Sequence, residues 1–102
     1  MGIRKQFLKS KPICKVTFSI PLEIAKDAQT VFLVGDFNDW SPTATPMKKM
    51  KNDGFSVTLD LEPGRIYQFR YLLDESRWEN DPDADGYCPT VYEDANNGML
   101  YL

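Results

Sequence analysis

The sequence predicts an all-β fold, an antiparallel β-sandwich of immunoglobulin-like build with about seven strands. In several short segments apolar residues alternate with polar ones, which is the period of a half-buried strand. Clusters of Gly, Pro, Asn and Asp separate these segments, as turns between strands require. A helical period is absent from the sequence apart from a possible single turn near residues 22–27.

The first half of the chain supplies two clear strands and one weaker run. A basic segment over residues 1–12 is expected to form an N-terminal arm, and ICKVTFSI (13–20) then alternates, with Cys14 on its apolar side. TVFLV (30–34) is apolar on both sides, as in a central strand that is covered on both faces. TPMKKM (45–50) is the weaker run and leads to an Asn-Asp-Gly turn.

The middle of the chain contains the clearest alternation. FSVTLDL (55–61) places four apolar residues on one face, and Glu-Pro-Gly then supplies a turn. In RIYQFRYLL (65–73) an aromatic file, which includes Phe69 and Tyr71, alternates with polar residues. The aromatic file is therefore the expected core face, and Arg70 should point outward.

The last third of the chain combines two short strands with an acidic loop. Residues 74–77 are expected to make a tight turn into a short strand that carries Trp78. PDADGYCPTVYEDANN (82–97) is expected to be a loop, and GMLYL (98–102) a final strand.

Length and composition indicate one domain, which we place at residues 13–102 after the arm. The sequence contains no apolar run near the length of a membrane span and no secretory signal, so the expected location is cytoplasmic, with no membrane partner. Such a location favours free thiols for Cys14 and Cys88, although two cysteines leave a disulfide open.

The charge pattern does not favour nucleic acid as a partner. Residues 1–51 carry nine Lys and Arg against four Asp and Glu, whereas residues 52–102 carry three against eleven. The basic residues are spread over strands and loops without a dense run, so nucleic-acid binding is not expected.

Catalysis is not expected either, and no catalytic residue is proposed. The chain contains no histidine, which removes the commonest general base and metal ligand. A glycosidase needs only two carboxylates, but it also needs a cleft that raises the pKa of one of them, which a small sandwich rarely has. We therefore expect a protein that is not an enzyme and that uses no cofactor.

The stretch DPDADG (81–86) resembles the beginning of a calcium-binding loop. Asp81, Asp83 and Asp85 occupy the first, third and fifth positions of that pattern, but its last ligand position falls on Tyr92 instead of Glu. The alternative is a solvated loop in which Asp residues cap turns. No metal site is therefore predicted.

Two tryptophans lie in polar surroundings and allow two interpretations. Trp40, in GDFNDWSP, could fold back over the end of the sandwich, and Trp78 could cover a cross-strand neighbour. Alternatively, both rings could offer flat apolar faces to the C–H side of a sugar while Arg70 bonds its hydroxyls. Because Arg70 is predicted to point outward near Trp78, the sugar platform remains open beside the structural interpretation.

Three stretches carry a resemblance to a known family: TVFLVGDFNDWSP, YQFRYLLDESRWENDP and NNGMLYL. Together they resemble the glycogen-binding domain of the AMP-activated protein kinase β subunit, which is carbohydrate-binding module family 48. The same early-set sandwich is found as the isoamylase N-terminal domain. The resemblance runs from about Lys15 to Leu102, and the basic start looks like that of small free-standing proteins built around this module.

The resemblance implies a set of sugar-binding residues. Its two stacking tryptophans fall on Trp40 and Trp78, its basic residue on Arg70 and its hydroxyl-binding asparagine on Asn96. The family usually has Lys where this chain has Arg70, which would change the contact geometry. The family's loop that inserts an aliphatic side chain into a curved glucan corresponds to the stretch around Tyr92.

The sequence thus favours a non-catalytic carbohydrate-binding module that recognises α-1,4-glucan, such as glycogen, starch or maltooligosaccharide, by aromatic stacking. The alternative is a protein–protein interaction module. In that case the same surface, or the basic arm, docks onto a glycan-metabolising enzyme or onto a second copy of the chain.

Overall fold

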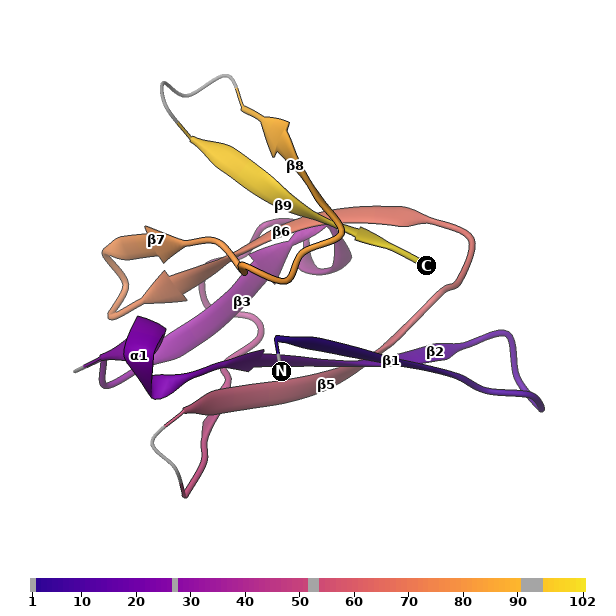
Figure 1. Cartoon of the computed structure of the whole chain (residues 1–102), viewed down its shortest axis with the longest axis horizontal. Helices are drawn as coiled ribbons and strands as arrows, with labels where there is room; N and C mark the ends of the chain where they lie inside the picture. Colours follow the sequence, from indigo (N-terminus) through magenta and orange to yellow (C-terminus); the bar gives the residue numbers. More distant parts are fainter. Residues whose placement is uncertain (1, 27, 52–53, 91–94) are drawn as a thin grey trace.

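The computed structural model describes residues 2–26, 28–51, 54–90 and 95–102. Within these ranges nine strands form two antiparallel sheets, accompanied by one short α-helix and one 3₁₀ turn. The two sheets lie face to face (Figure 1). The predicted all-β sandwich is therefore confirmed.

The first sheet has the strand order β1-β2-β5-β4. Its strands are β1 (Ile3–Phe7), β2 (Cys14–Ile20), β5 (Phe55–Leu61) and β4 (Lys48–Lys49). The β2–β5 pairing joins Cys14 to Leu61 and Ile20 to Phe55, so the apolar faces of the two alternating segments coincide.

The N-terminal segment differs from the arm expected over residues 1–12. Strand β1 pairs with β2 from Ile3 opposite Phe18 to Phe7 opposite Cys14, so much of this segment belongs to the first sheet. Basic residues interrupt the apolar pattern of this segment, so the sequence alone does not predict a strand here. The strand is formed by pairing with β2.

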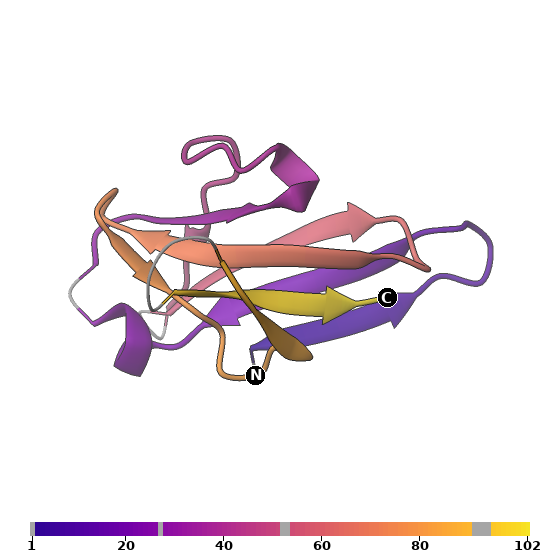
Figure 2. The same ribbon diagram turned by 90° about the horizontal axis from the view of Figure 1, so that it is seen from above.

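The second sheet has the order β3-β6-β9-β8, with β7 also paired to β6. Its strands are β3 (Val31–Gly35), β6 (Ile66–Leu73), β9 (Asn96–Tyr101), β8 (Gly86–Pro89) and β7 (Arg77–Glu79). Strand β9 runs beside β6 in the view from above (Figure 2).

Strand β6 is the centre of the second sheet. Strand β3 pairs along one edge of β6, while the other edge is shared: β9 pairs with its first half and β7 with its second half. Because β9 reaches only to Phe69 and β7 begins at Tyr71, Arg70 lies at the junction of two strands placed end to end.

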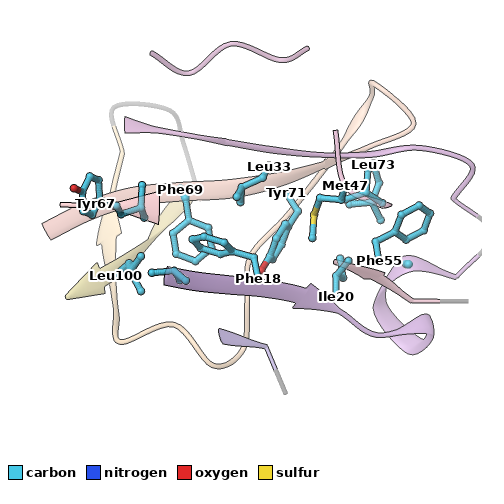
Figure 3. Packing of buried hydrophobic residues seen from close by; sticks show 14 of the residues in the cluster. Phe18, Ile20, Leu33, Met47, Phe55, Tyr67, Phe69, Tyr71, Leu73 and Leu100 are labelled. Atoms are coloured by element: carbon cyan, nitrogen blue, oxygen red, sulfur yellow. The ribbon is translucent and has the colours of Figure 1, made fainter. Parts of the chain in front are cut away.

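The core lies between the sheets and is rich in aromatic rings. Phe18 of β2 contacts Phe69 of β6 with ring centroids 5.2 Å apart, and Phe69 contacts Tyr71 at 5.8 Å, both edge to face (Figure 3). These three side chains are almost completely buried. The predicted core face of residues 65–73 is confirmed, and Arg70 alternates to the other face, as expected.

Two shorter elements complete the comparison with the sequence. Helix α1 (Leu22–Ala25) is the single helical turn expected near residues 22–27, and the 3₁₀ turn η1 covers Asp36–Asn38. Strand β8 lies inside the stretch 82–97 that was expected to be a loop. Its sequence GYCP contains Gly and Pro and carries a weak strand signal, and its place at the sheet edge is where Pro is tolerated.

Among the described residues, helices are too short to cross a membrane.

Candidate functional site

The polar loop after β3 holds Trp40 in place. The carboxylate of Asp36 accepts a hydrogen bond from the indole Nε1–H of Trp40 at 2.8 Å and another from the backbone N–H of Gln68 at 2.7 Å. One side chain therefore ties the tryptophan to strand β6 of the second sheet.

Asn38 fixes the same loop from the inside. Its Oδ1 accepts the N–H of Gly35 at 3.1 Å, and its Nδ2 donates to the carbonyl of Leu33 at 2.8 Å and to the hydroxyl of Thr45 at 2.9 Å. These bonds satisfy backbone groups that the end of β3 leaves unpaired. The polar residues of the loop thus form a scaffold.

The loop carries backbone strain at the tryptophan. Asp39 and Trp40 have φ values of 56° and 59°, in the left-handed region that costs a non-glycine residue about 1–2 kcal/mol. Asp adopts this region more readily than most residues, but a bulky Trp is an outlier there. Strain of this kind is found where the surrounding structure presents a side chain for function.

Gly35 allows the loop to start so close to β6. A Cβ atom at this position would lie 2.5 Å from the carbonyl oxygen of Gln68 and 2.8 Å from the Cβ of Phe69. Any larger residue would push β3 away from β6 and would move Trp40 with it.

Trp78 and Arg70 form the second part of the site. Trp78 lies opposite Leu72 on the outer face of the second sheet, and 45% of its surface is exposed. The guanidinium carbon of Arg70 lies 5.7 Å from the centroid of the Trp78 ring, within the range of a cation–π contact. Both residues come from the β6–β7 hairpin, so their relative position is set locally.

The junction between β9 and β7 holds the Arg70 side chain. Its Nε–H donates to the carbonyl of Asn96 at 3.1 Å, and Asn80 Nδ2 donates to the same carbonyl at 2.9 Å. The Nη2 atom of Arg70 is buried and has no hydrogen-bond partner among the described residues. A guanidinium donor is therefore left unsatisfied beside an exposed indole ring.

Two side-chain amides lie next to these groups. Asn97 Nδ2 donates to Oε1 of Gln68 at 2.9 Å, which links β9 to β6 on the outer face. This bond uses one group of each amide. The Nε2 group of Gln68 and the Oδ1 atom of Asn97 remain as a donor and an acceptor of the pair.

These side chains line one open cavity of about 780 Å³ on the outer face of the second sheet. Its lining consists of Trp40, Trp78, Arg70, Gln68, Asn97 and residues 88–90. Among the described residues its lining contains no Asp or Glu, and its one charged group is a guanidinium. Flat apolar rings beside hydrogen-bond donors and acceptors match a ligand that is apolar on one side and rich in hydroxyls on the other.

Of the predicted site residues that the structure describes, three line the cavity and one does not. The structure brings Trp40, Arg70 and Trp78 to the same cavity. The carbonyl of Asn96 holds Arg70 and Asn80, and the side chain that lines the cavity at this point belongs to its neighbour Asn97. Tyr92 lies outside the described residues.

Gln68 and Asn97 were missed at the sequence level. The alternation of β6 places Gln68 on the same face as Arg70, which could have identified it. Asn97 follows Asn96 directly, and only the register of β9 against β6 and β8 decides which of the two side chains faces the cavity.

Asp81, the first residue of the acidic stretch 81–86, is buried and bonds several neighbouring groups. Asp81 is 1% exposed, and its carboxylate accepts the Tyr71 hydroxyl at 2.6 Å and the backbone N–H of Asp83 at 2.7 Å. The hydroxyl of Tyr87, on β8, donates to the Asp81 carbonyl at 2.5 Å. Asp81 is therefore engaged in protein hydrogen bonds, and no group of three or more metal-binding side chains occurs in the described ranges.

Burial shifts the ionisation of this pair. It raises the pKa of Asp81, an effect that the hydrogen bonds from Tyr71 and from the Asp83 N–H oppose. Burial also raises the pKa of Tyr71 well above its ordinary value, and the Asp81 charge adds to this shift. Tyr71 therefore remains a neutral hydrogen-bond donor at physiological pH.

Both cysteines are free thiols. Cys14 is buried in the core, whereas Cys88 is half-buried and lines the cavity.

A second hollow, of about 440 Å³, lies against the first sheet. Its lining includes Arg4, Thr17, Ser19, Ser56 and Met50, and no tryptophan among the described residues. It lacks the flat rings that the first cavity offers.

Comparison with known proteins gives two matches. The family described as the glycogen recognition site of AMP-activated protein kinase matches residues 19–101. The protein PTST homolog 2, chloroplastic, of Arabidopsis thaliana is 42% identical over 55 residues. That alignment covers 54% of this chain and 10% of the relative, so the chain spans about a tenth of the relative's length.

Proposed function

The chain belongs to the family of the glycogen recognition site of AMP-activated protein kinase, a family of non-catalytic carbohydrate-binding modules, and from this premise we propose that its outer cavity binds an α-1,4-glucan. The observation that carries the proposal is the meeting of Trp40, Trp78 and Arg70 at one cavity. These residues come from one loop and two strands, and their side chains leave the core to reach this surface.

Stacking on the two indole rings provides the apolar part of binding. Each ring covers the C–H face of a glucose unit, which removes apolar surface from water. The rings are held before the ligand arrives, Trp40 by its bond to Asp36 and Trp78 by the hairpin and by Arg70. Pre-organisation lowers the entropy that binding costs, which matters for a ligand with weak individual contacts.

Hydrogen bonds to sugar hydroxyls provide the polar part. Within the described part of the chain, the Nη2 group of Arg70 is a buried donor without a partner, a state that costs about 1–3 kcal/mol. A sugar hydroxyl placed between the rings would accept this bond. The amide pair Gln68–Asn97 offers a further donor and acceptor at the cavity wall.

The cavity lining supports binding without hydrolysis. Glycoside hydrolysis requires two carboxyl groups on either side of the scissile bond. The lining provided by the described residues contains no carboxyl group, and the buried Asp81 is engaged by Tyr71 in the interior.

Asn96 and Tyr92 enter the proposal through the family resemblance alone. The side chain of Asn96 is exposed, but alternation along β9 directs it to the face opposite Asn97, so its role in binding rests on the resemblance. Tyr92 would then contact the glucan from the stretch that follows Thr90.

Isothermal titration with maltoheptaose tests the proposed function. The wild-type protein should bind, and Trp78→Ala should weaken binding at least about tenfold, because it removes one stacking face and the partner of Arg70. Phe7→Ala is a suitable control, since Phe7 is an exposed aromatic residue on the first sheet and should leave the affinity unchanged. Absence of binding by the wild type at millimolar ligand would contradict the proposal.

The same titration separates the docking alternative. A module that binds only a partner protein should show no heat with maltoheptaose in any variant. In that case charge reversal at Lys9 and Lys11, which are exposed and lie outside strand β1, should disrupt the complex with the partner protein, as measured by size-exclusion chromatography.

A further inference from the structure

The outer face of the second sheet continues beyond the cavity. In β6 and β9 the side chains of alternate residues share one face, and the register pairs Gln68 with Met99 and Ile66 with Tyr101. Because Gln68 lines the cavity, Ile66 and Tyr101 lie on the same face, one step further along both strands.

This continuation is apolar and open. Ile66 is 57% exposed and Tyr101 is 47% exposed, so both present large side chains to solvent. They are a cross-strand pair, which places an aliphatic and an aromatic side chain next to each other. Together the two side chains form a patch, the Ile66/Tyr101 patch, which lies next to Gln68 of the cavity lining on the same face of the sheet.

Gly86 makes room for the Tyr101 ring. A Cβ atom on Gly86 would lie 2.8 Å from Oη and 3.5 Å from Cζ of Tyr101, and 3.9 Å from the sulfur of Met99. The ring therefore reaches from β9 across to the neighbouring strand β8. Because 47% of the surface of Tyr101 is exposed, the ring is accessible to a ligand at this position.

The backbone of Tyr101 is held from both sides. Asp85 Oδ2 accepts the N–H of Tyr101 at 2.8 Å, and Lys5 Nζ donates to its carbonyl at 2.9 Å. Lys5 and Asp85 also form an ion pair at 2.6 Å. These contacts come from β1 and from the residue before β8, and they fix the position of Tyr101 before any ligand binds.

We propose that Tyr101, with Ile66 beside it, is an additional stacking position that extends the glucan site along the second sheet. The inference rests on the proposed function and names its substrate class: stretches of α-1,4-glucan that are longer than the cavity alone accommodates. Arg70 and Ile66 lie four residue steps apart on β6, about 13 Å along the strand, so a short ligand bound at Arg70 and Trp78 does not reach Tyr101, whereas a longer one passes Gln68 and continues onto the patch. The occupant is the same glucan chain, because the patch is continuous with the cavity and has polar Lys5 and Asp85 at its edge.

The test compares short and long ligands on matched variants. Affinities for maltotriose and for maltoheptaose are measured by isothermal titration on the wild type, Tyr101→Ala and Tyr101→Phe. The wild type should bind maltoheptaose more tightly, and Tyr101→Ala should reduce this preference about fivefold while leaving maltotriose binding unchanged. Tyr101→Phe keeps the ring and should retain the preference.

Two further variants keep the test decisive. Ile66→Ala leaves Tyr101 and its backbone bonds intact and should reduce the preference by a smaller factor, even if Tyr101→Ala folds poorly. Phe7→Ala should change nothing. An unchanged preference in both Tyr101→Ala and Ile66→Ala overturns the inference, whereas failure of the wild type to bind either ligand overturns the proposed function itself.

Discussion

The two sheets share one hydrophobic core but differ in how their outer faces use polar groups. On the first sheet, the hydroxyls of Thr17 and Thr58 bond each other at 2.9 Å, and Lys15 pairs with Asp60 at 3.0 Å. On the second sheet, the cavity contains indole rings and a guanidinium, one nitrogen of which no described residue bonds. On the first sheet, polar side chains of neighbouring strands bond one another. On the second sheet, aromatic and polar side chains line a cavity that a ligand can enter.

The difference has a topological cause. Along one edge of β6, β9 and β7 lie end to end, and Arg70 lies at their junction, where its Nε–H bonds the carbonyl of Asn96. The pairing of β2 with β5 is continuous over its whole length and leaves no such break. A site can therefore arise where strand pairing is interrupted, without any change in the core below.

The largest expected effect comes from a substitution in the hydrophobic core, to which both sheets contribute. Phe69→Ala removes a fully buried ring that contacts Phe18 and Tyr71, and it should lower the free energy of unfolding by about 3–5 kcal/mol. Urea denaturation measures this loss. Thr58→Ala, on the outer face of the first sheet, should change the same quantity by less than about 1 kcal/mol, and a similar loss in both variants would contradict the assignment of the core.

The next prediction compares an aspartate beside the cavity with an aspartate on the outer face of the first sheet, by their effects on stability and sugar affinity. Asp36→Ala removes the acceptor of the Trp40 indole and of the Gln68 N–H, so it should cost about 1–2 kcal/mol of stability and also weaken maltoheptaose binding. Asp60→Ala removes an exposed ion pair on the first sheet, which contributes about 0–1 kcal/mol, and should leave sugar affinity unchanged. Equal sugar affinity in the two variants would show that Asp36 does not position Trp40.

A smaller gain is expected in the hairpin that carries Trp78. Asp74 and Glu75 have φ values of 51° and 62° and are the central residues of a turn that the Ser76 N–H closes by donating to the Leu73 carbonyl at 3.1 Å; a turn of this conformation favours Gly at its second central position. Glu75→Gly should therefore raise the free energy of unfolding by about 1 kcal/mol. Thermal denaturation would measure the gain, and a lower midpoint would indicate that Glu75 has another role.

The smallest effects concern pH, and two aspartates should respond with opposite signs. Burial raises the pKa of Asp85, but bonds from Lys5 and from the Tyr101 N–H outweigh it, and the pKa lies below its ordinary value. The stabilisation from Asp85 is therefore present above the unfolded pKa of 3.8 and is lost as pH falls through the folded pKa. The pKa of Asp81 is raised by burial, so its contribution to stability is largest below the unfolded value and is lost as pH rises through the folded pKa.

Urea denaturation of Asp85→Asn and Asp81→Asn across the acidic range measures this contrast. The stability deficit of Asp85→Asn relative to wild type should shrink as pH falls. For Asp81→Asn the wild type should instead gain on the variant as pH falls. The same slope in both variants would contradict the assigned directions.

The sequence was informative where a local pattern determines the result. The alternation of residues 65–73 placed Phe69 in the core and Arg70 outside, and the polar loop around Trp40 was recognised as unusual. Pairing between distant segments was not accessible in the same way. The strand of residues 3–7 depends on its partner β2, and the Asp36 carboxylate reaches a backbone N–H of β6, 32 residues away.

The choice between Asn96 and Asn97 shows the same limit at one position. The two residues are identical in type, and only the register of β9 places Asn97 at the cavity. Likewise, the acidic pattern at residues 81–86 suggested a solvated loop or a calcium site, but Tyr71 from the core bonds Asp81 and buries it. Such contacts depend on tertiary structure and leave no local sequence signal.

Amide and indole chemical-shift mapping with β-cyclodextrin, a ring of α-1,4-linked glucose, tests the central claim most directly. The account predicts that the largest shifts occur at the indole N–H groups of Trp40 and Trp78 and at the side-chain amides of Gln68 and Asn97, while Thr17 and Thr58 on the first sheet stay unchanged. Shifts concentrated on the first sheet, or none at millimolar ligand, would contradict it.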